Sequence, residues 1–278
     1  MGLRGIIVVG FIILMATTLL ASIILGHAKL NRDPPNIGHV IATIQLGPGT
    51  GPWGIAYDPS NGYIYVADSG SNTVSVIDPV KYTVIDTVSF EGIFTGGSVP
   101  QEIAYDPSNG YLYVTLITKE YGFSYVAVIN TKANTVIGTI PISLGSGGIV
   151  YDPSNGYIYV ATPGNGAVVV INGANNTAIG TIQLGAGASP WGIAYDPNNG
   201  YLYVTDSESN IVYVIDGATN TVMGTIQLAP ESQSEGIVYD PSNGYLYAVD
   251  YSSDAVSVID PVKYTVIDTI VGVGLSPQ

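Results

Sequence analysis

The sequence predicts an all-β protein: a five-bladed β-propeller of four-stranded antiparallel blades, preceded by an N-terminal hydrophobic helix. The first observation behind this prediction is a heptapeptide, Tyr-Asp-Pro-Ser/Asn-Asn-Gly-Tyr, which begins at Tyr57, Tyr105, Tyr151, Tyr195 and Tyr239. The second is that four short apolar segments follow one another in every repeat. A period of about 45 residues with several short strands indicates a propeller blade rather than a helical solenoid.

The first repeat shows how each strand is inferred. An apolar run covers Gly54–Asp58, and the Pro-Ser-Asn-Gly that follows supplies the preset and positive φ angles of a tight turn. Aromatic and aliphatic residues alternate over Tyr63–Ala67, as they do in a strand. A polar turn then leads to a third strand, Thr73–Ile77, and Asp-Pro closes it before the fourth, Val84–Val88. We expect these four strands to form one antiparallel blade.

The repeats resemble the YVTN-family β-propeller repeat. The namesake motif appears as Tyr65-Val-Ala-Asp68, Tyr113-Val-Thr-Leu116, Tyr159-Val-Ala-Thr162, Tyr203-Val-Thr-Asp206 and Tyr247-Ala-Val-Asp250. The flanking Ser71–Asp78 also matches, and the resemblance covers about Val40 to Gly272. It implies a propeller of the surface-layer type, in a family that includes surface-layer proteins, binding modules and a few enzymes. Members often have seven blades, whereas this chain has five repeats.

The closure of the ring is a separate question, because Val40–Ile44 matches a fourth strand and stands before the first repeat. The chain therefore has one more fourth-strand segment than it has sets of the other three strands. We favour a closed ring whose last blade has five strands. The two alternatives are an incomplete ring and exchange of the surplus strand between copies, which predicts a homo-oligomer.

The N-terminal residues form a separate unit. Ile6–Leu25 is a mostly apolar run, long enough to span a bilayer, and Gly26-His27-Ala28 offers small residues where a signal peptidase cleaves. We expect residues 1–28 to be a signal peptide or a transmembrane anchor, and either one sends the rest of the chain across a membrane. The further divisions are a linker over 29–39, the propeller over 40–272 and a C-terminal tail over 273–278.

The composition excludes several classes of function. Lys+Arg is 7 and Asp+Glu is 21, giving a net charge of −14, so the chain lacks the clustered basic residues that bind nucleic acid. The chain has no cysteine, and its two histidines, His27 and His39, precede the repeats. We therefore expect no cofactor. Ca²⁺ is the one metal ion that the oxygen ligands of the repeats suit, although no contiguous calcium-loop motif is present.

A candidate ligand-binding surface lies on the face that carries the loops after the second and fourth strands. In a closed ring, the fourth, fifth and first repeats would be neighbours, and the second strand of each ends in an aspartate. Their first strands begin beside a tryptophan or a glutamate. The residues predicted to form this acidic and aromatic surface are Trp53, Asp68, Trp191, Asp206, Glu235 and Asp250.

Two interpretations of this surface stay open. In the structural one, each Asp caps a tight loop and the indole rings fill gaps between blades. In the functional one, the carboxylates and indoles bind a cation, a sugar or a partner. The Asp-Pro turns on the opposite face are interpreted as organising their own backbone. Asn175-Asn-Thr177 is an N-glycosylation sequon in a third-to-fourth strand turn, which makes Asn175 a candidate glycosylation site.

The favoured function is that of an exported propeller, cell-surface (membrane-anchored) or extracellular, which acts as a non-catalytic binding or structural module. Its partner would be a cell-surface protein or a glycan, and it would meet the membrane through the N-terminal segment. The alternative is a secreted carbohydrate-active hydrolase or lyase that uses Asp and Glu on the same face, for which fold analogy is the support.

Overall fold

The computed structural model describes residues 40–272, and this part of the chain consists mostly of β-strands. Five four-stranded sheets follow one another along the sequence, and in each the strands pair in chain order. Blade 1 contains β1 (Pro52–Asp58), β2 (Tyr63–Asp68), β3 (Thr73–Asp78) and β4 (Thr83–Ser89). Blade 2 contains β5 (Ser98–Asp106), β6 (Tyr111–Thr118), β7 (Phe123–Asn130) and β8 (Thr135–Leu144).

The three other blades have the same organisation. Blade 3 contains β9 (Ile149–Asp152), β10 (Tyr157–Thr162), β11 (Ala167–Asn172) and β12 (Thr177–Gln183). Blade 4 contains β13 (Pro190–Asp196), β14 (Tyr201–Asp206), β15 (Ile211–Asp216) and β16 (Thr221–Gln227). Blade 5 contains β17 (Ser234–Asp240), β18 (Tyr245–Asp250), β19 (Ala255–Asp260) and β20 (Thr265–Val271). Two short 3₁₀ turns, η1 (Pro163–Asn165) and η2 (Tyr251–Ser253), precede β11 and β19.

The heptapeptide forms the hairpin turn between the first two strands of each blade. In blade 3 the Oδ1 atom of Asp152 accepts a hydrogen bond of 2.8 Å from the N–H of Ser154, and the N–H of Gly156 donates to the Asp152 carbonyl at 2.9 Å. Gly156 has a φ of 75°, which is why glycine stands there. The side chain of Asn155 then accepts from the N–H of Tyr157 at 2.8 Å. The Asp-Pro motif therefore organises its own turn, as predicted.

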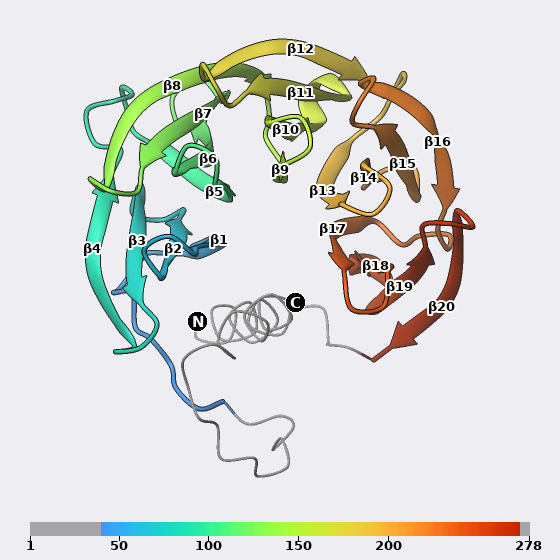
Figure 1. The fold of residues 1–278 in the computed structure, drawn as a ribbon, viewed down its shortest axis with the longest axis horizontal. Coiled ribbons are helices and arrows are strands. Elements are labelled where there is room, and N and C mark those ends of the chain that lie inside the picture. The colour runs from blue at the N-terminus through green and yellow to red at the C-terminus, as the bar shows by residue number, and fades with distance from the viewer. Residues whose placement is uncertain (1–39, 273–278) are drawn as a thin grey trace.

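Successive blades are joined by four apolar clusters, one at each junction. At the junction of blades 3 and 4, Tyr159, Val168 and Val170 pack against Leu202 and Val204. Each side chain of this size that is fully buried contributes about 1.5–3 kcal/mol, so the junctions supply much of the stability. Figure 1 shows the result: the first strands lie around the centre and the fourth strands form the outer rim.

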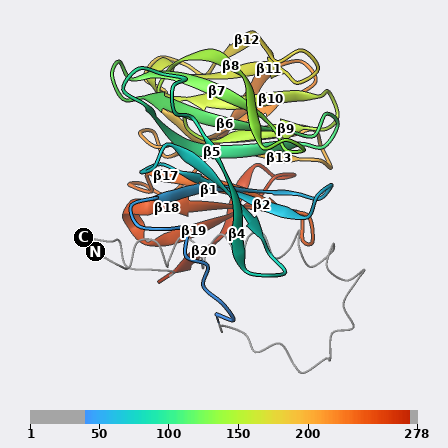
Figure 2. The ribbon, with the colours of Figure 1, turned by 90° about the vertical axis from the view of Figure 1, so that its left-hand side faces the viewer.

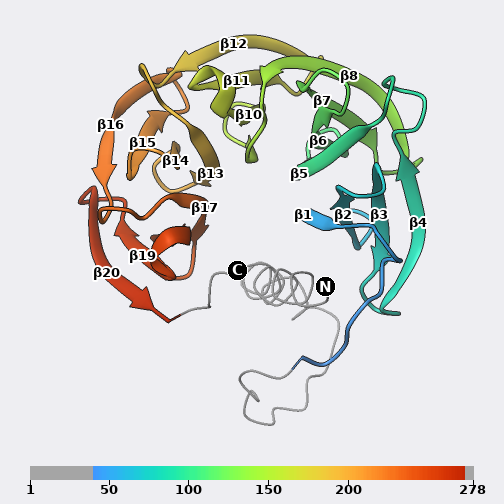
Figure 3. The ribbon, with the colours of Figure 1, turned by 180° about the vertical axis from the view of Figure 1, so that it is seen from behind.

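The five blades form a crescent rather than a closed ring. Each first strand packs beside that of the next blade from β1 through β5, β9 and β13 to β17, but β17 and β1 lie apart on either side of an opening (Figures 1 and 3). The expected five-stranded closing blade is wrong, because the last sheet has four strands and Val40–Ile44 lies outside every strand of the described chain. The physical reason is that the packed junctions fix the angle between blades, and five such steps leave the crescent open.

The predicted architecture of five four-stranded antiparallel blades is confirmed. Blade 2 is the irregular one, as expected. Its strands are longer than their equivalents in the other blades, and the added residues lengthen the hairpin of β6 and β7 (Figure 2). The predicted N-terminal helix, linker and C-terminal tail fall outside the described residues. Within residues 40–272, no helix is long and apolar enough to cross a membrane.

Candidate functional site

The start of each inner strand is the place where the five blades differ most. The inner strands read Pro-Trp-Gly-Ile, Pro-Gln-Glu-Ile, Ser-Gly-Gly-Ile, Pro-Trp-Gly-Ile and Ser-Glu-Gly-Ile, and then all continue into Ala or Val, Tyr and Asp. The second position in this series holds Trp53, Gln101, Gly147, Trp191 and Glu235. Blade packing sets the positions that recur, so a position that changes from blade to blade is one that the fold does not dictate. We call these five residues the variable inner position.

A β-bulge carries the variable inner position in four of the five blades. Pairing between the first and second strands shifts register between Pro52 and Ile55 in blade 1, and at the equivalent place in blades 2, 4 and 5. A bulge leaves its residues out of the regular ladder and redirects their side chains, and bulges are frequent beside active sites. Trp53 is 46% exposed, a large value for an indole in an inner strand.

The residue after the variable inner position is constrained by the next blade. A Cβ on Gly54 would lie 2.3 Å from the carbonyl oxygen of Gln101, and one on Gly192 would lie 2.2 Å from that of Glu235. Both distances are far inside van der Waals contact, so glycine is needed where one inner strand passes closely beside another. Blade 2 has Glu102 at this position instead.

Glu102 is the most perturbed carboxyl group of the inner strands. It is partly buried, and its Oε2 atom lies 3.1 Å from the point where a Cβ on Gly54 would stand, so the carboxyl group lies against the inner strand of blade 1. Burial raises the pKa of Glu102 from 4.5 to about 7, and its interaction with the indole of Trp53 offsets part of that rise. Burial also raises the pKa of Glu235 on β17. Burial therefore raises the pKa values of two carboxyl groups on the inner strands.

The three predicted aspartates are buried at the ends of their second strands. Asp206 accepts hydrogen bonds from the N–H groups of Glu208 and Ser209, each at 3.0 Å, and Asp250 accepts one of 2.6 Å from the Ser257 hydroxyl. Ser75 makes the equivalent contact with Asp68 at 2.6 Å. All three carboxylates thus bond within their own blades, as in the structural interpretation, and their role in ligand binding stays a prediction.

The structure brings some of the predicted surface together and separates the rest. Blades 4 and 5 are in contact, which places Trp191 and Asp206 next to the blade that carries Glu235 and Asp250. Trp53 and Asp68 belong to blade 1, on the other side of the opening. The expectation that these residues form one continuous acidic and aromatic surface is therefore wrong in one respect, because it assumed that blades 5 and 1 are in contact.

Glu102 is not among the residues predicted from the sequence to form the ligand-binding surface. The signal was present in the alignment of the five repeats, because four blades have glycine at this position and only blade 2 has a carboxylate. The raised pKa of Glu102 could not be predicted from the sequence, because it depends on how closely the inner strand of blade 1 approaches the carboxyl group.

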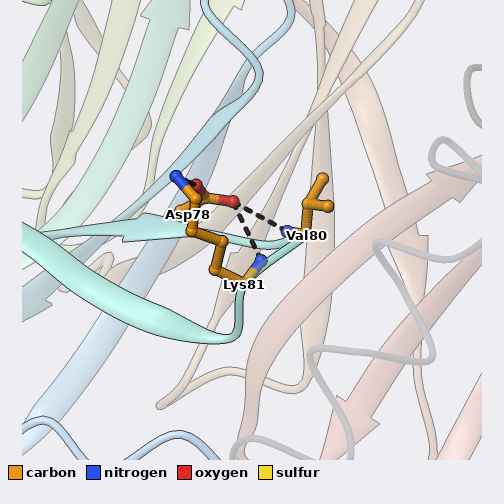
Figure 4. A network of polar contacts seen from close by, with 3 residues as sticks. All are labelled: Asp78, Val80 and Lys81. Carbon is orange, nitrogen blue, oxygen red and sulfur yellow. Dashed lines mark hydrogen bonds and ion pairs between the residues drawn. The ribbon is translucent and has the colours of Figure 1, made fainter.

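The described chain offers few cations and no cluster of metal-binding residues. Within residues 40–272, no group of three or more His, Cys, Asp or Glu side chains is placed to hold a metal ion. Two of the lysines form ion pairs in third-to-fourth strand turns. Lys81 Nζ lies 2.7 Å from Asp78 Oδ2, and the backbone N–H groups of Val80 and Lys81 donate to the same carboxylate (Figure 4). Lys263 forms the equivalent ion pair with Asp260. Acidic residues outnumber basic ones in the chain, 21 to 7.

Comparisons with known proteins agree with this architecture. Residues 148–275 match a repeat of unknown function, DUF6923, and residues 50–77 match the NHL repeat. The chain is a β-propeller repeat protein. A solved chain of Kuenenia stuttgartiensis hydrazine synthase is similar in structure, with a TM-score of 0.62, 20% sequence identity, and coverage of 81% of this chain and 67% of that chain. At this identity the likeness concerns the fold alone. No curated protein matches the sequence, and the resemblance to the YVTN family stays a prediction.

Proposed function

We propose that this protein is an exported, non-catalytic binding module of the cell surface whose ligand contacts the variable inner position. The observation that carries the proposal is that both tryptophans of the chain, Trp53 and Trp191, occupy this one position, while the residues around it repeat from blade to blade. Binding sites commonly combine aromatic surface with a few polar groups that fix orientation. Gln101 and Glu235 supply such groups in the neighbouring inner strands.

The net charge of the protein indicates which kind of ligand it favours. A net charge of −14 disfavours an anionic ligand and favours a cationic one. The carboxyl groups of Glu102 and Glu235 on the inner strands can also exchange hydrogen bonds with hydroxyl groups of a ligand. An ammonium group over an indole face gains a further 0.5–2 kcal/mol, roughly. A surface glycan with amino sugars meets both conditions, and a basic segment of a cell-surface protein is the second candidate.

Export rests on the N-terminal segment predicted from the sequence. Removal of residues 1–28 would release the propeller, whereas retention would tether it to the membrane. Mass spectrometry of the mature N-terminus distinguishes the two forms, and the same spectra test whether Asn175, which is exposed in the turn between β11 and β12, carries a glycan. A full-length product recovered only from the cytosol would contradict export.

Tryptophan fluorescence tests the binding proposal directly, since the chain has only two tryptophans and both lie at the variable inner position. The purified protein is titrated with glucosamine oligomers and, for comparison, with their neutral N-acetylated forms. We expect a saturable change in emission with the cationic oligomer, and a loss of affinity of about tenfold or more in Trp53→Phe or Trp191→Phe. The control is Tyr121→Ala, which removes a 65% exposed ring from the β6–β7 hairpin. Equal affinity in all four proteins would contradict the proposal.

A hydrolase remains the second candidate because of one observation. A carboxylic acid with a pKa of about 7 has the property required of a general acid at neutral pH, and Glu102 has it beside an exposed indole. Reducing-end release from the same oligomers is the measurement. Turnover that Glu102→Gln abolishes without loss of binding would establish the enzyme and overturn the non-catalytic assignment.

A further inference from the structure

The two terminal faces of the crescent are built like the faces that meet inside it. At each junction the leading face of one blade, with the tyrosine of its second strand at the centre, packs on the trailing face of the next blade. Blade 5 has the leading residues, including Tyr247, Val256 and Val258, and blade 1 has the trailing residues Ile64 and Ile77. No cluster of buried apolar residues joins these two faces in the described chain.

The terminal faces are less covered than their internal equivalents. Ile270 of blade 5 is 45% exposed, whereas the equivalent side chains in blades 1 to 4 (Val88, Ile140, Ile182 and Ile226) are between 1% and 7% exposed. Tyr247 is partly exposed, although the corresponding tyrosines of the other four blades are fully buried. On blade 1, Ile64 is partly exposed where the other blades have fully buried Leu or Ile.

Polar contacts show the same difference. At the junctions of blades 1 to 4 the tyrosine hydroxyl meets two acceptors of the next blade. One is a carbonyl oxygen, of Thr131 at 3.4 Å from Tyr65, of Gly173 at 3.3 Å from Tyr113 and of Gly217 at 3.0 Å from Tyr159, and the other is the nearer side-chain oxygen of Asn134, Asn176 or Asn220. In the described chain, Tyr203, at the junction of blades 4 and 5, has a hydrogen-bond partner only in its own blade, the amide of Asn199 at 2.9 Å. Within the described residues, the Tyr247 hydroxyl has a partner only in its own blade, the side-chain amide of Asn243 at 2.9 Å. Tyr247 differs from Tyr203 in being partly exposed, so the leading face of blade 5 presents a hydroxyl donor that no following blade covers.

The segment before blade 1 is a fourth strand without a blade. Val-Ile-Ala-Thr-Ile-Gln-Leu-Gly from Val40 parallels Ala-Ile-Gly-Thr-Ile-Gln-Leu-Gly from Ala178, which forms β12 at the rim of blade 3. Both segments lead into the following blade in the same way, because the Gly51 carbonyl accepts from Ser69 N–H at 3.0 Å and the Ser189 carbonyl accepts from Ser207 N–H at 3.1 Å. Unlike β12, the segment 40–44 pairs with no strand of the described chain, and Ile41 is 85% exposed.

We infer that the opening is a docking site for a three-stranded antiparallel β-sheet from a second polypeptide that carries the same repeat, and that Val40–Ile44 joins this sheet as its fourth strand. Such a sheet continues the contacts that already hold the blades together. Its third strand pairs with Val40–Ile44, its trailing face covers Tyr247 and Ile270, and its leading face covers Ile64. A helix cannot replace it, because its carbonyls are satisfied internally and it offers no edge to a strand.

The test uses a synthetic probe with residues Pro190–Asp216, which form the first three strands of blade 4. In blade 4 the register pairs Tyr213 with Thr225, and Thr43 stands at the position of Thr225 in the unpaired segment. The chain has no cysteine, so Thr43→Cys in the full chain and Tyr213→Cys in the probe report on one contact. We expect a disulfide between chain and probe, formed at least about tenfold faster than with the control probe Val214→Cys, whose side chain points to the other face of the sheet.

Two further arms make each outcome decisive. The same probe sequence linked after Gln278 raises the effective concentration, so failure of the free peptide to fold does not hide the contact. A chain that begins at Lys29 removes the predicted signal or anchor segment. Because export permits both the full chain and the chain that begins at Lys29, a register-specific disulfide with either of them supports the inference. Disulfide-linked pairs of Thr43→Cys chains in place of the probe adduct, or absence of the register-specific disulfide in every arm, would overturn the inference.

Discussion

The hydroxyl group of Tyr159 in blade 3 donates a hydrogen bond of 3.0 Å to the carbonyl oxygen of Gly217 in blade 4. The side-chain amide of Asn155 donates to both atoms, at 2.9 Å to the hydroxyl and at 3.0 Å to the carbonyl. The second strand of one blade is thus tied to the third-to-fourth strand turn of the next, and Tyr65 and Tyr113 make the same contact at the two preceding junctions. Burial raises the pKa of Tyr159, so this hydroxyl remains a donor.

Removing this hydroxyl should destabilise the protein in an internal blade but not in the last one. Tyr159→Phe leaves the buried Gly217 carbonyl with one donor fewer, and we expect the free energy of unfolding to fall by about 1–2 kcal/mol. Tyr247→Phe, the matched change in blade 5, should alter it by less than about 0.5 kcal/mol, because Tyr247 has no acceptor in a following blade within the described chain. Urea denaturation measures both. Equal losses would contradict the open end of the crescent.

Close contact between inner strands predicts a severe effect at Gly192. A Cβ there would stand 2.2 Å from the Glu235 carbonyl oxygen, so Gly192→Ala must push blades 4 and 5 apart. We expect a loss of roughly 1–3 kcal/mol in the free energy of unfolding. Gly180→Ala on the outer strand β12 is the control, because a Cβ there meets no atom within 4 Å. The prediction fails when thermal unfolding shows the two variants to be equally stable.

The raised pKa of Glu102 predicts a pH-dependent stability. The unfolded side chain titrates near 4.5 and the folded one near 7, so the folded protein holds the proton more tightly. Its contribution to stability is fully present below pH 4.5 and is lost as the pH rises through 7. Between pH 4 and pH 8 the wild type should therefore lose roughly 2–3 kcal/mol relative to Glu102→Gln. Glu91→Gln, which removes an exposed carboxylate, is the control, and a pH dependence equal to that of Glu102→Gln would contradict the prediction.

Much of the fold was predictable because it is local. The Asp-Pro turn, the alternation over Tyr63–Ala67 and the four-strand order depend on neighbouring residues within one repeat, and the structure confirms them. Closure was not predictable in the same way. It depends on the angle at which Tyr65 and Val76 of one blade pack against Leu112 and Val114 of the next, and that angle has no signature in the strand pattern.

The candidate site was predictable in part. The tryptophans and Glu235 stand out in the sequence because they interrupt a regular repeat, and the structure places them on the inner strands. The aspartates stand out equally, but their burial and their bonds to Ser75 and Ser257 appear only once the hairpins are formed. Glu102 also stands out, because the other four repeats have glycine at its position. Its raised pKa could still not be predicted, because it depends on contact with another blade.

The open crescent is tested most directly by the distance between the two end blades in solution. Val80 and Val262 are equivalent positions in blades 1 and 5, 85% and 83% exposed, and Lys132 is the exposed equivalent in blade 2. Cysteines placed there in this cysteine-free chain accept nitroxide labels for pulsed electron paramagnetic resonance. An open crescent predicts a clearly longer distance for the pair 80 and 262 than for the pair 80 and 132, which belongs to adjoining blades. Equal distances for the two pairs would mean a closed ring and would contradict it.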